Sequence, residues 1–184
     1  RALDRGIDDD TARYLIFLCG TSMTNLITEI EKAAAFCTTG MIKRYHIDTV
    51  CTKVLDAVVF DLSDAITERR FDKAIALVND LLAQKNPEVV IFSTIARHMQ
   101  RLYAAKLNES ARGSEKELLN LLGSTSPYYA KRIRSAAHKL PESWLRQSVL
   151  LCGQTDAALK SSAADKQKLI ELALLEMAAG LGRS

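Results

Sequence analysis

Apolar side chains recur with helical spacing along most of this chain, and residues that break helices are scarce. Between positions 71 and 82 they fall at i, i+3, i+4, i+7, i+10 and i+11, which makes one face of a helix apolar. The 184 residues include only eight glycines and three prolines, too few for a fold with many tight turns. The pattern predicts an all-α protein of roughly nine helices.

The first 58 residues are expected to form a small three-helix bundle. A first helix, over 11–19, follows acidic residues that suit a helix start and stops at Gly20, and a second, over 23–37, can be capped by Thr21 or Ser22. A third, short helix is expected to hold the remaining apolar residues of this part and to start near Asp48. Those residues are Ile47, Val50, Cys51, Val54 and Leu55.

A new apolar period begins near residues 57–60, and we place a domain boundary there. A short strand over these residues is the alternative to a helix. The boundary lacks Pro, Gly and Ser, so a flexible linker is not expected there. Residues 59–184 are expected to form a larger helical bundle. Its last helix, over 165–181, is apolar nearly all round and should be central or covered by a partner.

The net charge of +3 is small but uneven, because residues 97–146 hold ten basic and four acidic side chains. A basic surface of this kind can meet nucleic-acid phosphates, and Tyr128 and Tyr129 lie just before its densest part. The alternative is a solvated helix face with the tyrosines in the core. The nucleic-acid candidates are Arg97, Arg101, Lys131, Arg132 and Arg134, with His138 and Lys139 in the same cluster.

Sequence motifs for chemistry are missing. There is no phosphate-binding GxxxxGK[ST] or GxGxxG and no GxSxG; the histidines lie far apart, and the four cysteines lack CxxC spacing. We therefore expect no catalytic, cofactor-binding or metal-binding residues, and reduced, partly buried thiols. An enzyme or regulatory domain whose site assembles only in space is a third reading.

No apolar run approaches the roughly 20 residues of a membrane span, so we expect a cytoplasmic protein without a membrane partner. The chain starts at Arg1 with no methionine, from which we expect a piece of a longer protein.

Five segments in order along the chain resemble the delta subunit of bacterial DNA polymerase III, a component of the sliding-clamp loader. They are Leu26 to Lys32; Phe60, Leu62, Asp64, Ala65 and Ile66; Pro87; Gln100, Arg101 and Leu102; and Asp156, Leu159 and Lys160. In relatives that hydrolyse ATP, a lid helix opens with an arginine that reaches the nucleotide. The matching stretch here ends in Met23, which cannot donate a hydrogen bond to a phosphate, as in the non-hydrolysing delta subunit.

The resemblance implies a lid domain over 1–58, a collar domain over 59–184, and an N-terminal AAA+-like domain outside this chain. It implies a replication protein without activity of its own, a component of the DNA polymerase holoenzyme whose collar binds other loader subunits. The sliding clamp would be contacted only through the missing domain, and DNA is possible within the assembly. Interface candidates are Leu145, Val149, Cys152, Asp156, Lys160, Leu169, Leu172 and Met177.

Overall fold

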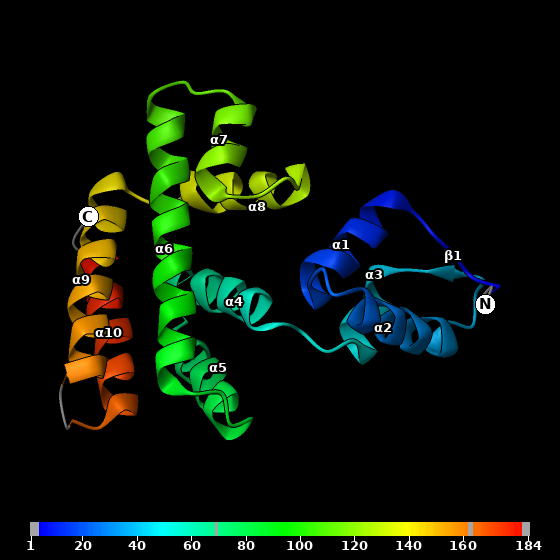
Figure 1. Cartoon of the computed structure of the whole chain (residues 1–184), viewed down its shortest axis with the longest axis horizontal. Helices are drawn as coiled ribbons and strands as arrows, with labels where there is room; N and C mark the ends of the chain where they lie inside the picture. The colour runs from blue at the N-terminus through cyan, green and yellow to red at the C-terminus, as the bar shows by residue number, and fades with distance from the viewer. Residues whose placement is uncertain (1–3, 69, 162–163, 182–184) are drawn as a thin grey trace. The chain divides into compact units, whose positions relative to one another are not determined.

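The computed structural model describes residues 4–68, 70–161 and 164–181, and nearly all of its elements are helices (Figure 1). The all-α prediction is confirmed. In chain order the described elements are β1 (Gly6–Ile7), α1 (Asp9–Cys19), α2 (Met23–Phe36), β2 (Met41–Ile42), α3 (Arg44–Val50), α4 (Leu55–Thr67), α5 (Phe71–Ala83), α6 (Glu88–Ser110), α7 (Glu115–Leu122), α8 (Pro127–His138), α9 (Glu142–Ser161) and α10 (Lys166–Leu181).

The chain divides into two compact units, Arg1–Val58 and Val59–Ser184. The division falls inside helix α4, so the strand that sequence left open for 57–60 is wrong. Buried side chains fall in pairs three residues apart, at 59–60, 62–63 and 65–66, which fits the period of a helix and not the alternation of a strand. A four-residue apolar run is too short to show that period, and this is why sequence alone left both readings open.

The smaller unit packs α1, α2 and α3 around one apolar core. Asp8 caps α1 through its side chain, which accepts a hydrogen bond from the Thr11 amide, and Gly20 ends it at a φ of 81°. The buried core residues are Leu15, Leu18, Cys19, Ala33, Ala34, Cys37, Ile42 and Ile47. A two-residue parallel pair, Ile7 beside Ile42, joins the start of the unit to the segment before α3.

The third helix differs from its predicted position. It begins at Arg44, because the His46 side chain accepts a hydrogen bond from the Lys43 amide and satisfies a free N–H at the helix start. It ends at Val50: the Cys51 amide still donates to the Ile47 carbonyl, but the Thr52 amide donates to the Glu29 carboxylate at 2.9 Å instead of continuing the helix. A local capping bond therefore sets the start of α3, and a tertiary hydrogen bond sets its end.

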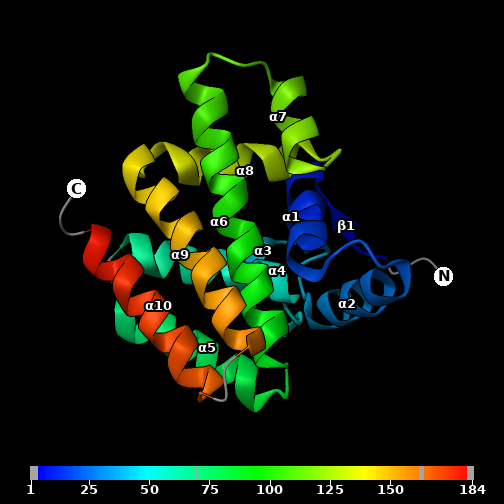
Figure 2. The same ribbon diagram turned by 60° about the vertical axis from the view of Figure 1, so that its left-hand side comes forward.

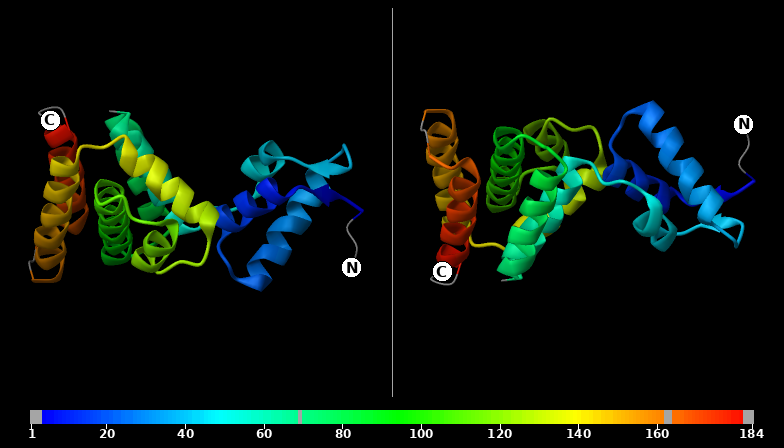
Figure 3. Two further views of the ribbon diagram at one scale, coloured as in Figure 1. Left: turned by 90° about the horizontal axis from the view of Figure 1, so that it is seen from above. Right: turned by 90° about the horizontal axis from the view of Figure 1, so that it is seen from below.

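The larger unit is built around the long helix α6. It packs against α9 along much of its length and also against α7 and α8, while the hairpin of α9 and α10 lies beside it (Figures 2 and 3). The buried stripe of α6 repeats with helical spacing and consists of Ile91, Phe92, Thr94, Ile95, His98, Met99, Leu102, Ala105 and Asn108. A long helix with so many buried positions forms the centre of this unit.

Helix α10 is not central in the larger unit. Its buried face packs against α9, α5 and α6, but Leu172 is 55% and Leu175 46% exposed. The other reading of its apolar sequence, a face covered by a partner, stays a prediction. Among the described residues, no helix is both long and apolar enough to cross a membrane.

His98 is a buried titratable group in the core of the larger unit. It is 4% exposed, and its ring lies edge-on to Phe60 with the centroids 4.4 Å apart. In the described structure its Nε2 atom has no hydrogen-bond partner. Burial, with the charge of Arg101 nearby, lowers the pKa of His98 from 6.5 to about 3. The imidazole is therefore neutral in the folded protein at neutral pH.

Replacing His98 with leucine, which has a similar volume and does not titrate, should remove one source of acid sensitivity. Between pH 6.5 and about 3 the unfolded chain binds a proton that the folded chain excludes. The unfolding free energy of the wild type should therefore fall relative to His98→Leu by roughly 1 kcal/mol per pH unit in this window, and stay level above it. Denaturant titrations at several pH values measure this difference. A constant difference would contradict the buried neutral histidine.

Candidate interaction surfaces

The interface candidates on α9 and α10 separate into buried and exposed residues. Leu145, Cys152 and Met177 are at most 2% exposed and lie in the core of the larger unit. The Met177 carbonyl accepts a hydrogen bond from the indole of Trp144 at 2.7 Å, which links the two helices. These three were chosen by apolar period, and a helical period selects the side facing the chain's own core. Buried there, they offer a partner almost no surface, and a role for them in an interface stays a prediction.

The other candidates remain accessible. Val149 and Leu169 are half-buried and Leu172 is exposed, while Asp156 and Lys160 form an i,i+4 ion pair at 2.6 Å on the surface of α9. An exposed pair at this spacing contributes a few tenths of a kcal/mol to helix stability. This contribution to helix stability is sufficient to explain why Asp156 and Lys160 form an ion pair.

Two exposed leucines of the same hairpin were missed by the sequence reasoning. Leu150 on α9 is 55% exposed, and Leu175 lies three residues after Leu172, on the same face of α10. A helix that is apolar all round gives no periodic signal that separates its inner from its outer leucines. The exposed face is therefore visible only once α10 is packed.

Three of the five nucleic-acid candidates make contacts inside the larger unit. Arg101 donates to the Tyr129 hydroxyl at 2.9 Å and lies 5.4 Å from the centre of that ring. Arg132 lies 5.5 Å from the centre of the Phe60 ring. Arg97 donates to the Thr94 hydroxyl one turn back on α6. Cation–π and hydrogen-bond contacts of this kind hold α4, α6 and α8 together, so Arg101 and Arg132 are tied to the fold.

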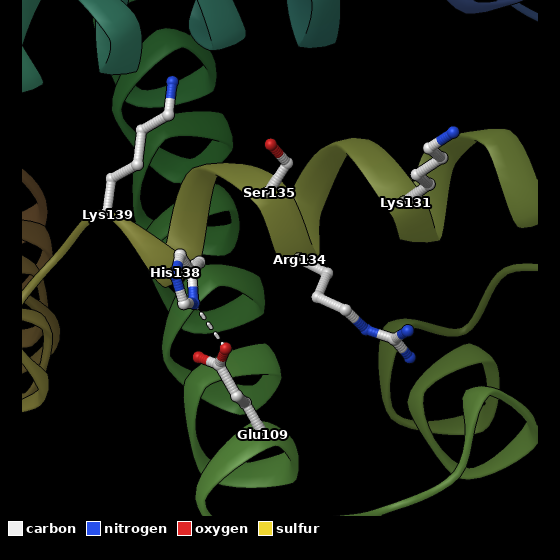
Figure 4. A pocket seen from close by; sticks show the side chains of 6 residues that line it. All are labelled: Glu109, Lys131, Arg134, Ser135, His138 and Lys139. Carbon is white, nitrogen blue, oxygen red and sulfur yellow. Dashed lines mark hydrogen bonds and ion pairs between the residues drawn. The ribbon is translucent and has the colours of Figure 1, made fainter.

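The remaining two candidates, Lys131 and Arg134, belong to a shallow pocket of about 330 Å³. We call its lining the α8 basic strip: Glu109, Lys131, Arg134, Ser135, His138 and Lys139. Figure 4 shows Lys131, Ser135 and Lys139 projecting from one side of α8, and Arg134 and His138 from the other side. The cations are spread along the helix and do not converge on one point. Such a strip suits an extended polyanion better than a single small ion.

The one acidic group of the strip is already paired. His138 Nδ1 lies 2.5 Å from a Glu109 oxygen, and the ammonium of Lys106 lies 3.5 Å from the other oxygen. The hydrogen bond to His138 and the charges of His138 and Lys106 lower the pKa of Glu109. Within the described residues, Lys131 and Arg134 pair with no carboxylate. The strip therefore presents positive charge to the solvent.

Three side chains of the smaller unit lie close enough together to ligate one metal ion, although the sequence predicted no metal site. The sulfur atoms of Cys19 and Cys51 and a carboxylate oxygen of Glu29 lie within 4.8 Å of one another. These residues are 10 and 22 positions apart in sequence and match no ligand spacing, so no motif could reveal them.

Comparisons with known proteins agree with the helical architecture. The family model described as DNA polymerase III delta subunit, C-terminal domain, matches residues 56–177. The curated DNA polymerase III subunit delta of Bacillus subtilis (strain 168) is 24% identical over 174 residues, which cover 93% of this chain and 49% of that protein.

A solved structure, the Bacillus subtilis DNA clamp loader delta protein (YqeN), has a similar fold with a TM-score of 0.78 at 22% identity. The match covers 96% of this chain and 52% of that one, so the chain spans about half the length of these relatives. Because the family model matches well over half of the chain, this chain belongs to the family of the DNA polymerase III delta subunit, C-terminal domain.

Proposed function

We propose that this chain is the lid and collar part of a clamp-loader delta subunit, an assembly component without catalytic activity of its own. The unit Arg1–Val58 would be the lid and Val59–Ser184 the collar. In support, the family model begins at residue 56, close to the division between the units. Both B. subtilis relatives are named as delta proteins, one of DNA polymerase III and one of a DNA clamp loader.

The exposed leucines of α9 and α10 are the observation that carries this proposal. Leu150, Leu172 and Leu175 are each about half exposed on a helix pair whose other faces are packed. Burying a fully exposed leucine is worth about 1.5–3 kcal/mol, so each offers roughly 1 kcal/mol to a partner that covers it. We propose that neighbouring loader subunits cover this face. The role of the collar is then positional: it holds the rest of the subunit in the assembly.

Contact with the sliding clamp is proposed for the part of the subunit that lies outside the matched half. The relatives are about twice as long as their matched regions, which leaves room for a further domain. The fragment should then bind other loader subunits without opening the clamp or hydrolysing ATP.

The double variant Leu172→Asp/Leu175→Asp should weaken binding to the other loader subunits about a hundredfold or more, because it replaces apolar contacts with two charges that need water. Binding can be measured by analytical size exclusion and calorimetry with purified subunits. Val90→Asp/Leu121→Asp is the matched control, since Val90 is 46% and Leu121 58% exposed on other helices of the larger unit.

Circular dichroism should show both double variants folded. If the α10 variant binds as tightly as the wild type, or if the control variant loses as much affinity, the proposed interface is wrong.

A second candidate function is nucleic-acid binding by the collar, and the α8 basic strip is what favours it. Lys131 and Arg134 have no carboxylate partner in the described part of the chain, and the cations follow the helix axis. Phosphate contacts of this kind bind DNA without reading its sequence, and their strength falls steeply with salt.

If the strip binds DNA, Lys131→Glu/Arg134→Glu should reduce the slope of log K against log salt by about 2, since each lost phosphate contact removes roughly 1. Fluorescence anisotropy with a short DNA duplex at several salt concentrations measures this. Lys73→Glu/Arg146→Glu makes the same charge change at exposed positions of α5 and α9. Equal losses in both variants would mean that only net charge matters, and an unchanged slope in the strip variant would rule out the site.

A further inference from the structure

Three residues that the proposed function does not use come together in the smaller unit. Cys19 is the last residue of α1, Glu29 lies in the middle of α2, and Cys51 directly follows α3. Cys19 and Glu29 are 1% and 3% exposed, while Cys51 is half-buried and can be reached from solvent. Their sulfur and carboxylate atoms lie within 4.8 Å of one another. Solvent can therefore reach the cluster at Cys51, while Cys19 and Glu29 are buried.

Hydrogen bonds hold the backbone on each side of the cluster. The Asn25 side chain donates to the Cys19 carbonyl at 2.7 Å, which fixes the end of α1. The Cys51 thiol donates to the Glu29 carbonyl at 3.5 Å, and the Thr52 amide donates to the Glu29 carboxylate at 2.9 Å. The segment after α3 is therefore bound to α2 at the same place. Such supporting contacts are what preorganise a ligand set.

The spacing and the donor types fit a thiophilic divalent cation. Two thiolates and one carboxylate are ligands that Zn²⁺ takes, with Zn–S near 2.3 Å. Tetrahedral ligands at that length place two sulfur atoms about 3.8 Å apart. Because the three ligand atoms here are within 4.8 Å, closing the site needs a movement of about 1 Å or less.

We propose that Cys19, Glu29 and Cys51 form a three-ligand site for a thiophilic divalent cation of the Zn²⁺ type, with a fourth position open to water at the Cys51 edge. The ion would join the end of α1, the middle of α2 and the segment after α3. Burial raises the pKa of Cys19 to about 12 and that of Cys51 to about 11, so each thiol gives its proton to solvent when the ion binds.

Lys32 competes with the ion. Its ammonium lies 2.7 Å from the Glu29 carboxylate and donates to the Thr52 hydroxyl at 3.3 Å. The Lys32 side chain is 38% exposed, so it can turn into solvent when a cation takes its place. Removing the Lys32 charge frees the Glu29 carboxylate and removes the repulsion between the ammonium and the bound ion. A variant without this charge should therefore bind the ion more tightly.

The test is a titration of the reduced, metal-free full chain with Co²⁺ as a spectroscopic probe, followed by competition with Zn²⁺. The wild type should bind one ion per chain and show thiolate-to-cobalt charge-transfer absorption that Zn²⁺ abolishes. Cys19→Ser and Cys51→Ser should each lower the affinity at least tenfold, Glu29→Gln about tenfold, and Lys32→Met should raise it about tenfold. Cys37→Ser and Cys152→Ser, which alter buried thiols outside the cluster, should bind as the wild type does.

The site is disproved if Co²⁺ and Zn²⁺ do not bind at one per chain, or if the Cys37 variant loses as much affinity as the Cys51 variant. Should the cluster variants fail to fold, labelling of the wild type with N-ethylmaleimide gives an independent answer. Zn²⁺ should slow labelling of Cys19 and Cys51 and leave Cys37 and Cys152 unchanged. Equal rates with and without Zn²⁺ would also overturn the proposal.

Discussion

Burial of the α6 stripe is the constraint on which the larger unit depends, because α7, α8 and α9 all pack on this helix. The side chains that fill it, among them Ile95, Met99 and Leu102, are fully buried, so none can change size without disturbing a neighbour. With α6 fixed, α9 forms the hairpin with α10, and α8 holds the basic strip. Figures 1 and 3 show α8 and α9 as separate helices beside α6. The two candidate surfaces therefore share a scaffold but belong to different elements.

Local signals made most of the fold predictable from the sequence. Ser114 and Glu117 form a reciprocal cap at the start of α7, Pro127 opens α8, and Gly123 ends α7 in the left-handed conformation. The parts that could not be predicted depend on distant contacts. The end of α3 is set by a bond between Thr52 and Glu29, 23 residues apart, and the strands β1 and β2 are too short to show a period.

The candidate surfaces were predictable only in part. Lys131, Arg134 and His138 lie on one short helix and Lys139 directly follows it, so local charge density found them. The sequence did not distinguish them from Arg132, which faces Phe60. On α9 and α10 the apolar period selected residues that face the core. The exposed leucines could be identified only from the packing of the two helices as a hairpin. The Cys19–Glu29–Cys51 cluster depends on three helices meeting and has no local signal.

A positional role for the collar follows if partners cover the outer face of α9 and α10. Hydrogen–deuterium exchange of the chain, alone and with the other loader subunits, tests this most directly, because covered helices open less often and exchange more slowly. The account predicts slower exchange in residues 166–181 and in the facing part of α9 on assembly, with little change in α7. Unchanged exchange in α10 within a formed complex would contradict it.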